Sequence, residues 1–192
     1  YANPFDAAHL IRDLGFRAFA RPVGKPDEMV IATAAASPLR CLEDLRPGSR
    51  IAVTDNRDVK LIGLRLLEAA DLTDKDLQWV LVETFQAGAR LTIKGEVDAG
   101  FFLAEIYHSL SRITRSQLKV LIESAIFDIT HVLLAHQRIV GEIPAIMTAL
   151  SGIGQRSADH EVLEALGIPG GFEKMNDEEA EFMVDLMDTL LD

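Results

Sequence analysis

The stretch RIAVTDNRDVKLIGLRLLEAA, residues 50–70, indicates the fold class of this chain. Its first five residues are rich in β-branched side chains and form the compact apolar run that is typical of a buried strand. A polar turn follows at residues 55–57, and from Asp58 the apolar residues recur at helical spacing as far as Ala70. The stretch therefore predicts a strand, a turn and a long amphipathic helix.

The same order of strand and helix recurs along the chain. Gly15 is placed to end a first helix in a left-handed cap, and the segment after Gln137 is predicted to be helical throughout. Strands that alternate with helices indicate an α/β fold with largely parallel sheets covered on both faces. The predicted helices before Gln137 are 5–14, 42–45, 58–70 and 86–94, and the predicted strands are 16–23, 29–35, 50–54, 79–84, 97–103, 118–123 and 130–135.

Composition and charge exclude several classes of partner. The chain has 192 residues, 48% of them hydrophobic, with a formal net charge of −11, which repels nucleic-acid phosphates and anionic lipid surfaces. Cys41 is the only cysteine, so an intrachain disulfide and a multi-thiolate metal site are excluded. The longest apolar stretches, such as residues 129–135, are too short to span a bilayer. We therefore expect a globular protein that neither binds nucleic acid nor spans the membrane.

The sequence offers no catalytic group, cofactor motif or metal-ligand spacing. The histidines are scattered, and no serine nucleophile elbow, phosphate-binding loop or dinucleotide glycine motif occurs. His131 and His136 flank an apolar strand, so we expect them at its two ends. We therefore predict no catalytic residue, no metal ligand and no cofactor. A chance pair of carboxylates that come together in space is an alternative that the sequence leaves open.

Five short motifs carry a resemblance to a known family. In their order and spacing they resemble the phosphate, phosphite and phosphonate (PhnD-like) substrate-binding proteins of ABC transporters. The resemblance implies a type II periplasmic-binding-protein-like fold, with two lobes built on mainly parallel sheets. Members of that family carry further strands and helices before the segment that matches Tyr1, so lobe one is expected to be incomplete at its N-terminus. The motifs are YANP at 1–4, LEDLRPG at 42–48, IAVTD at 51–55, GEVDAG at 95–100 and LEALGI at 163–168.

The same resemblance divides the chain and implies its function. Residues 1–35 and 127–192 would form a discontinuous lobe one, and residues 36–126 would form lobe two. The protein would then be a periplasmic or otherwise extracytoplasmic solute-binding protein, not an enzyme, that captures a small polar solute between its lobes for an ABC transporter permease. Two alternatives stay open: a ligand-sensing domain that acts on a signalling partner, and an enzyme on the same scaffold.

The family grips its ligand at the amino end of a lobe-two helix, and the matching turn here contains Asp55, Asn56 and Arg57. Asp55 and Asp58 are placed to cap and neutralise the backbone amides that would otherwise receive an anion. Arg57 could restore attraction through its planar guanidinium group. The alternative is that Asp55 is only an N-cap and Arg57 only a surface residue. We expect, from the two carboxylates, that the protein does not bind phosphonate tightly.

A second strand-to-helix turn supplies Thr84, Phe85 and Gln86 as ligand-binding candidates. Phe85 stands where the family often has a histidine, which favours stacking over hydrogen bonding, and its alternative role is that of a core aromatic. Because parallel strands place their ligand sites at their carboxyl ends, Asp55 and Thr84 are expected at the same edge of one sheet.

Three further candidates lie outside these two turns. Asp98 precedes a strand and could be a cleft acid that faces an amine, or could simply cap a turn. Tyr1 and Asn3 belong to a lobe-one loop that could close over the ligand. Asn3 followed by proline is equally a signal for the start of a helix.

Overall fold

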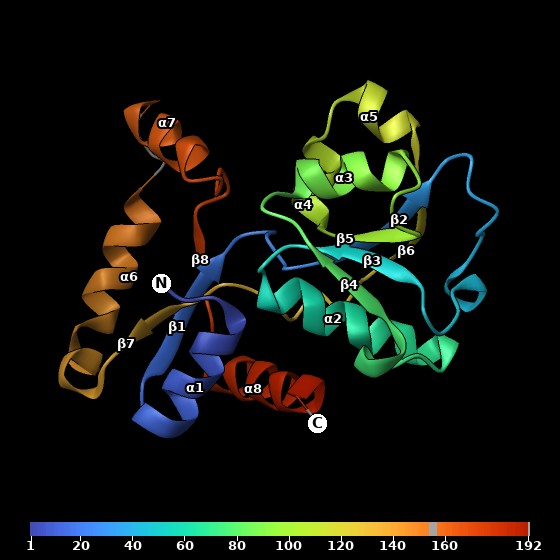
Figure 1. The fold of residues 1–192 in the computed structure, drawn as a ribbon. Coiled ribbons are helices and arrows are strands. Elements are labelled where there is room, and N and C mark those ends of the chain that lie inside the picture. The colour runs from blue at the N-terminus through green and yellow to red at the C-terminus, as the bar shows by residue number, and fades with distance from the viewer. Residues whose placement is uncertain (154–156, 192) are drawn as a thin grey trace. The chain divides into compact units, whose positions relative to one another are not determined.

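The computed structural model describes residues 1–153 and 157–191 and divides into two compact units (Figure 1). Unit 1 consists of Tyr1–Asp27 with Phe127–Asp192, and unit 2 consists of Glu28–Ile126. The first boundary falls earlier than the one expected after residue 35. The reason is strand β2 (Met29–Ala34), which pairs on both sides with strands of unit 2.

Unit 2 is built on a five-stranded mixed sheet. The strand order is β4-β3-β5-β2-β6, with β3 parallel to both β4 and β5 and with β2 antiparallel to both β5 and β6. The expectation of mainly parallel sheets is therefore wrong in this detail. Strands β3 to β6 are joined through helices and run in one direction, whereas β2, which precedes them in the chain, lies between β5 and β6 and runs the opposite way. The strands are β2 (Met29–Ala34), β3 (Arg50–Val53), β4 (Gln78–Leu81), β5 (Ala99–Leu103) and β6 (Leu118–Glu123).

Helices cover both faces of this sheet, and two neighbouring phenylalanines show how. Phe101 and Phe102 are fully buried, and consecutive residues of a strand point to opposite faces. Helix α2 packs over Phe101 at Gly63, where a Cβ atom would lie 2.2 Å from the Phe101 ring. On the other face, Phe102 contacts Tyr107, with ring centroids 5.8 Å apart. Figure 1 shows α2 on one side of the sheet and α3 and α4 on the other; the helices of unit 2 are α2 (Arg57–Leu67), α3 (Phe85–Ile93), α4 (Ala104–Ser109) and α5 (Arg112–Ser116).

Short 3-10 turns complete unit 2. They lie mostly in the connections, and the second extends α2 by one turn, as the periodicity up to Ala70 predicted. Near the unit's boundary, the buried Glu28 carboxylate accepts hydrogen bonds from the Ser124 hydroxyl and from the Ile126 amide. The 3-10 turns are η1 (Leu42–Asp44), η2 (Glu68–Ala70) and η3 (Asp74–Asp76).

Unit 1 contains a three-stranded antiparallel sheet of order β7-β1-β8. Strand β8 corrects the expectation that the chain after Gln137 is entirely helical. It has only three residues and follows Gly170 and Gly171, too short a run to show the alternation of a strand. The elements are α1 (Pro4–Leu14), β1 (Arg17–Pro22), β7 (Leu133–Ala135), η4 (Gln137–Glu142), α6 (Ile143–Gly152), α7 (Ser157–Ala165), β8 (Phe172–Lys174) and α8 (Asp177–Leu191).

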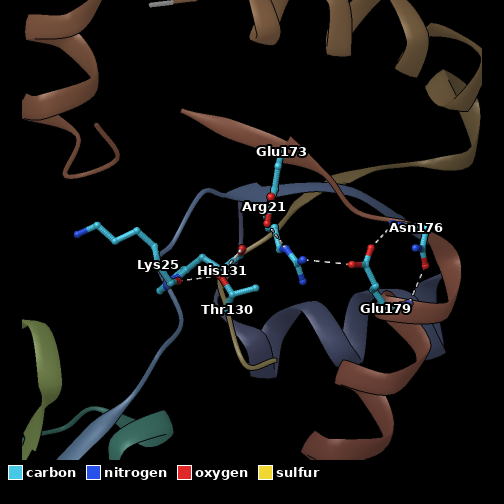
Figure 2. Close-up of polar contacts among 7 residues, drawn as sticks. All are labelled: Arg21, Lys25, Thr130, His131, Glu173, Asn176 and Glu179. Carbon is cyan, nitrogen blue, oxygen red and sulfur yellow. Dashed lines mark hydrogen bonds and ion pairs between the residues drawn. The ribbon is translucent and has the colours of Figure 1, made fainter. Parts of the chain in front are cut away.

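Polar contacts fix the ends of the unit 1 elements. Helix α1 ends at Gly15 in the left-handed conformation, as predicted, with φ 64° and ψ 29°. Helix α8 starts at a reciprocal cap, in which Asn176 Oδ1 accepts from the Glu179 amide and Glu179 Oε2 accepts from the Asn176 amide. Arg21 of β1 joins this cap to β8, because it lies 2.7 Å from Glu173 Oε1 and 3.1 Å from Glu179 Oε1 (Figure 2).

Within the described ranges 1–153 and 157–191, no helix is both long and apolar enough to cross a membrane.

Candidate ligand-binding site

Two polar turns of unit 2 lie beside each other at the carboxyl edge of its sheet. Val53 pairs with Leu81 in parallel register, and the Val82 amide donates to the Val53 carbonyl at 2.9 Å. The chain after Val53 and the chain after Val82 therefore leave the sheet at the same edge and enter α2 and α3. Asp55 and Thr84 share this edge, as the sequence predicted.

Both helices at this edge begin at a side-chain cap, and the cap of α2 differs from expectation. Asn56 caps α2, because its Oδ1 accepts from the Val59 amide at 3.0 Å, and Asp55 is exposed one residue before the cap. The alternative of Asp55 as the N-cap is therefore wrong, since the helix begins one residue later than that role requires. Asp58 lies in the first turn, as predicted. Thr84 caps α3, with its Oγ1 accepting from the Ala87 amide at 3.1 Å.

Thr54 adds a feature at this edge that the sequence analysis did not nominate. Its hydroxyl oxygen is buried and has no hydrogen-bond partner in the described part of the chain. Buried polar atoms are nearly always paired, so an unpaired hydroxyl at a strand end needs an explanation. The only sequence signal is its place as the first polar residue after a buried strand, where ligand contacts of α/β sheets lie.

The remaining unit 2 candidates do not join this group. Phe85 is half-buried and packs against the core, with its ring centroid 6.4 Å from that of Phe102, which is the alternative role considered for it. Gln86 is exposed and lies in a hollow on the outer side of α3. Asp98 lies at the amino end of β5, where its Oδ2 accepts from the Arg50 amide at 2.7 Å. Because β3 and β5 are parallel, Asp98 is at the opposite edge of the sheet from Asp55, and the expectation of a shared site fails on that geometry.

Of the two unit 1 candidates, Tyr1 contacts His131. The Tyr1 ring stacks on the His131 ring at 5.2 Å and 13°, and meets Phe172 edge to face at 6.4 Å. His131 Nδ1 lies 3.1 Å from Asp27 Oδ2, and the Asp27 side chain is only 12% exposed. That oxygen makes no well-aligned hydrogen bond within the described residues. Sequence analysis placed His131 at a strand end and missed its pairing with Asp27.

The segment that carries His131 is held by backbone and side-chain contacts. The Asp27 amide donates to the Ile129 carbonyl at 2.6 Å, and the Thr130 hydroxyl donates to the Lys25 carbonyl at 2.9 Å. Figure 2 shows Thr130 and His131 against the segment that contains Lys25. These hydrogen bonds therefore hold the segment that carries His131 in place.

The Asn3 side chain caps the start of α1. Its Oδ1 accepts from the Asp6 amide and its Nδ2 donates to Asp6 Oδ2, both at 2.9 Å. This is the helix-start role that the sequence allowed for it. Beside it, Tyr1, Asp6, His9 and His131 line an open hollow of about 560 Å³.

The chemistry of these groups is that of hydrogen bonding and stacking. At the carboxyl edge of unit 2, the acids Asp55, Asp58 and Glu83 outnumber Arg57. Over residues 1–153 and 157–191, no group of three or more histidine, cysteine, aspartate or glutamate side chains is placed to hold a metal ion. Unit 2 therefore carries polar groups at this edge that can form hydrogen bonds, and unit 1 carries the Tyr1 and His131 rings.

Solved structures show which class of proteins has this fold. A binding-protein component of a phosphonate ABC transporter from Pseudomonas aeruginosa matches 98% of this chain and 68% of its own, with a TM-score of 0.74 and 17% identity. PhnD1 from Prochlorococcus marinus in complex with methylphosphonate matches 99% of this chain and 84% of its own, with a TM-score of 0.69 and 13% identity. The fold is that of the type II periplasmic binding proteins.

Another match has a higher identity but a lower TM-score and a smaller share of the matched protein's length. A periplasmic sulfonate-binding protein, SsuA, from Methylobacillus flagellatus is 22% identical over 76% of this chain, with a TM-score of 0.55. The chain spans about half, 47%, of that protein's length. No curated protein sequence matches this chain.

The family follows from the sequence profile. The family described as "ABC transporter, phosphonate, periplasmic substrate-binding protein" matches residues 1–180. The chain belongs to this family, which confirms the resemblance carried by the five motifs.

Proposed function

We propose that this chain acts in an extracytoplasmic solute-binding protein that delivers a small polar solute, chemically unchanged, to an ABC transporter permease. The family match over residues 1–180 carries the proposal. The two turns at the carboxyl edge of unit 2 support it, because α/β sheets bind their ligands at this edge. Thr54 and Thr84 are the proposed hydroxyl contacts there, and Tyr1 with His131 is the proposed aromatic surface on unit 1.

We propose further that the solute is neutral or amine-bearing and that phosphonate binds weakly. The Asn56 and Thr84 side chains already occupy one amide at the start of each helix. Asp55 and Asp58 add negative charge at the same edge, and two unit charges about 4 Å apart repel by about 1 kcal/mol in water and by more where water is excluded. A single arginine, Arg57, lies between these two acids in the sequence.

Calorimetry on the full-length protein tests the charge of the ligand. Methylphosphonate, phosphate and a panel of neutral and amine-bearing solutes are titrated at neutral pH and moderate salt. We expect weak or undetectable heat with the two anions and binding to a member of the panel. Submicromolar binding of methylphosphonate, with a binding free energy of about −8 kcal/mol, would contradict the proposed charge of the solute but would support the proposed solute binding. A folded protein that binds no solute at all would contradict the proposed function itself.

Thr54→Val tests whether the unpaired hydroxyl contacts the solute found in that screen. Valine keeps the shape and removes only the hydroxyl, so thermal stability should hold or rise, because no protein hydrogen bond is lost. Solute affinity should fall about tenfold, or about 1.4 kcal/mol. Thr33→Val, at the opposite edge of the same unit, is the matched control, since it loses the bond to the Asp98 carbonyl and should lower stability instead.

A further inference from the structure

A basic hollow lies between α3 and α5 on unit 2. Its volume is about 370 Å³, and Gln86, Arg90 and Lys94 line one wall. Thr114 and Gln117 line the opposite wall. It is not part of the carboxyl edge described above, because its lining runs along the outer side of α3.

The charge of this hollow differs from that of the whole chain. The two helices contain Arg90, Arg112 and Arg115 and no acidic residue, in a chain whose formal net charge is −11. No acidic residue lines the hollow in the described ranges. Lys94 lies 3.4 Å from Glu96, whereas Arg90 has no ion-pair partner among residues 1–153 and 157–191.

The donors on α3 form a regular row. Gln86, Arg90 and Lys94 are four residues apart, so they lie along one face of the helix at intervals of about 6 Å. In an extended segment, side chains two residues apart lie on the same face at a spacing of about 6.6 Å. The row therefore matches carboxylates at alternate positions of an extended acidic segment better than it matches one small anion.

Apolar side chains accompany the charges. Ile93 and Leu110 line the same hollow, and Ile113 of α5 is 75% exposed. A segment seated here would bury these groups as well as pair its carboxylates, and apolar burial contributes about 25 cal/mol for each Å² removed from water. A free inorganic anion would gain only the charge interaction.

We propose that the hollow between α3 and α5 binds an acidic, extended segment of a partner protein, with carboxylates of alternate residues facing Arg90 and Lys94. The proposal does not depend on which solute the carboxyl edge of unit 2 binds. Arg90 supplies a planar guanidinium group that can donate two parallel hydrogen bonds to a carboxylate, and Lys94 supplies a point charge one helical turn further along.

A labelled peptide of about twelve residues, with glutamate at every second position and leucine between them, tests the proposal by fluorescence anisotropy on the full chain. We expect binding that weakens at least tenfold from low to high salt, because exposed charges are screened. The double variant Arg90→Glu with Lys94→Glu should weaken binding at least tenfold at low salt. A charge-matched control, Arg40→Glu with Lys75→Glu, alters exposed cations of unit 2 outside the hollow and should bind within about twofold of the parent chain.

Three outcomes would overturn the proposal. Unchanged peptide binding by the hollow variant would place the peptide elsewhere, and equal loss in both double variants would show attraction to net charge alone. Displacement of the peptide by inorganic phosphate at equal concentration would identify a small-anion site instead. Circular dichroism of the variants establishes that a loss of binding is not a loss of folding.

Discussion

Unit 2 encloses its sheet with helices on both faces, whereas unit 1 covers its two faces unequally. In unit 2, the inner strand β2 is buried from Met29 to Thr33, and α2 and α3 cover Phe101 and Phe102 from opposite sides. In unit 1, one face of the sheet packs against α1 and α8 around Ala18 and Met183. On its other face lies α6, none of whose residues is buried.

This difference in packing between the two units arises from their helices and not from their strands. Helix α6 carries no charged residue, and its apolar side chains, among them Ile143 and Met147, are only partly buried against Phe19. A helix half exposed in this way removes less apolar area from water than α2 or α3 does. We therefore expect unit 2 to contribute more to the stability of the described chain than the α6 side of unit 1.

The largest expected effect is that of Phe101→Ala. This ring is 1% exposed and touches Trp79 edge to face, with centroids 5.5 Å apart, so its loss should lower the free energy of unfolding by about 3 to 5 kcal/mol. Phe172→Ala, on the α6 side of unit 1, is the matched control and should cost about 1 to 2 kcal/mol. Urea unfolding followed by circular dichroism measures both, and an equal loss would contradict the difference in packing between the units.

A smaller effect is expected for Gly63→Ala. The added methyl group would meet the Phe101 ring at 2.2 Å, so α2 or the ring must shift, at a cost of about 1 to 3 kcal/mol. Gly141→Ala in unit 1 has no atom within 4 Å of the new methyl group and should change stability by less than about 0.5 kcal/mol. If both variants unfold at the same urea concentration as the parent, the close approach of α2 to the sheet does not constrain unit 2.

Hydrophobic periodicity predicted most of the fold. The helix over residues 5–14, its glycine end and the strand and helix units from residue 50 to 103 all appear where expected, because the helices show their period and the strands are compact apolar runs. Strand β8 was missed since three residues show no alternation. The antiparallel pairing of β2 also could not be predicted, because strand direction depends on partners distant in sequence.

The candidate site was predicted less completely. The shared edge of Asp55 and Thr84 followed from the parallel order of β3 and β4, which local sequence does indicate. The place of Asp98 at the opposite edge follows from the same parallel order, because Asp98 precedes β5, and naming it as a ligand contact overlooked that order. The pairing of His131 with Asp27 joins residues far apart in the chain, and no local pattern signals it.

The smallest expected effect concerns Asp76, at the surface of unit 2 and far from the packing that distinguishes the units. The hydroxyl and the amide of Thr73 both donate to Asp76 Oδ2, at 2.6 and 2.8 Å, and these bonds hold the pKa of Asp76 below its ordinary value. A carboxyl whose pKa is lower in the folded state stabilises the fold above its unfolded pKa of about 3.9 and loses that contribution as the pH falls through the lower folded value. Thr73→Val removes the hydroxyl, so the pKa of Asp76 should rise toward the ordinary value, as a titration followed by carboxyl-carbon NMR would show. An unchanged pKa in the variant would mean that the Thr73 amide alone sets it, and the acid sensitivity of unit 2 would then owe nothing to this hydroxyl.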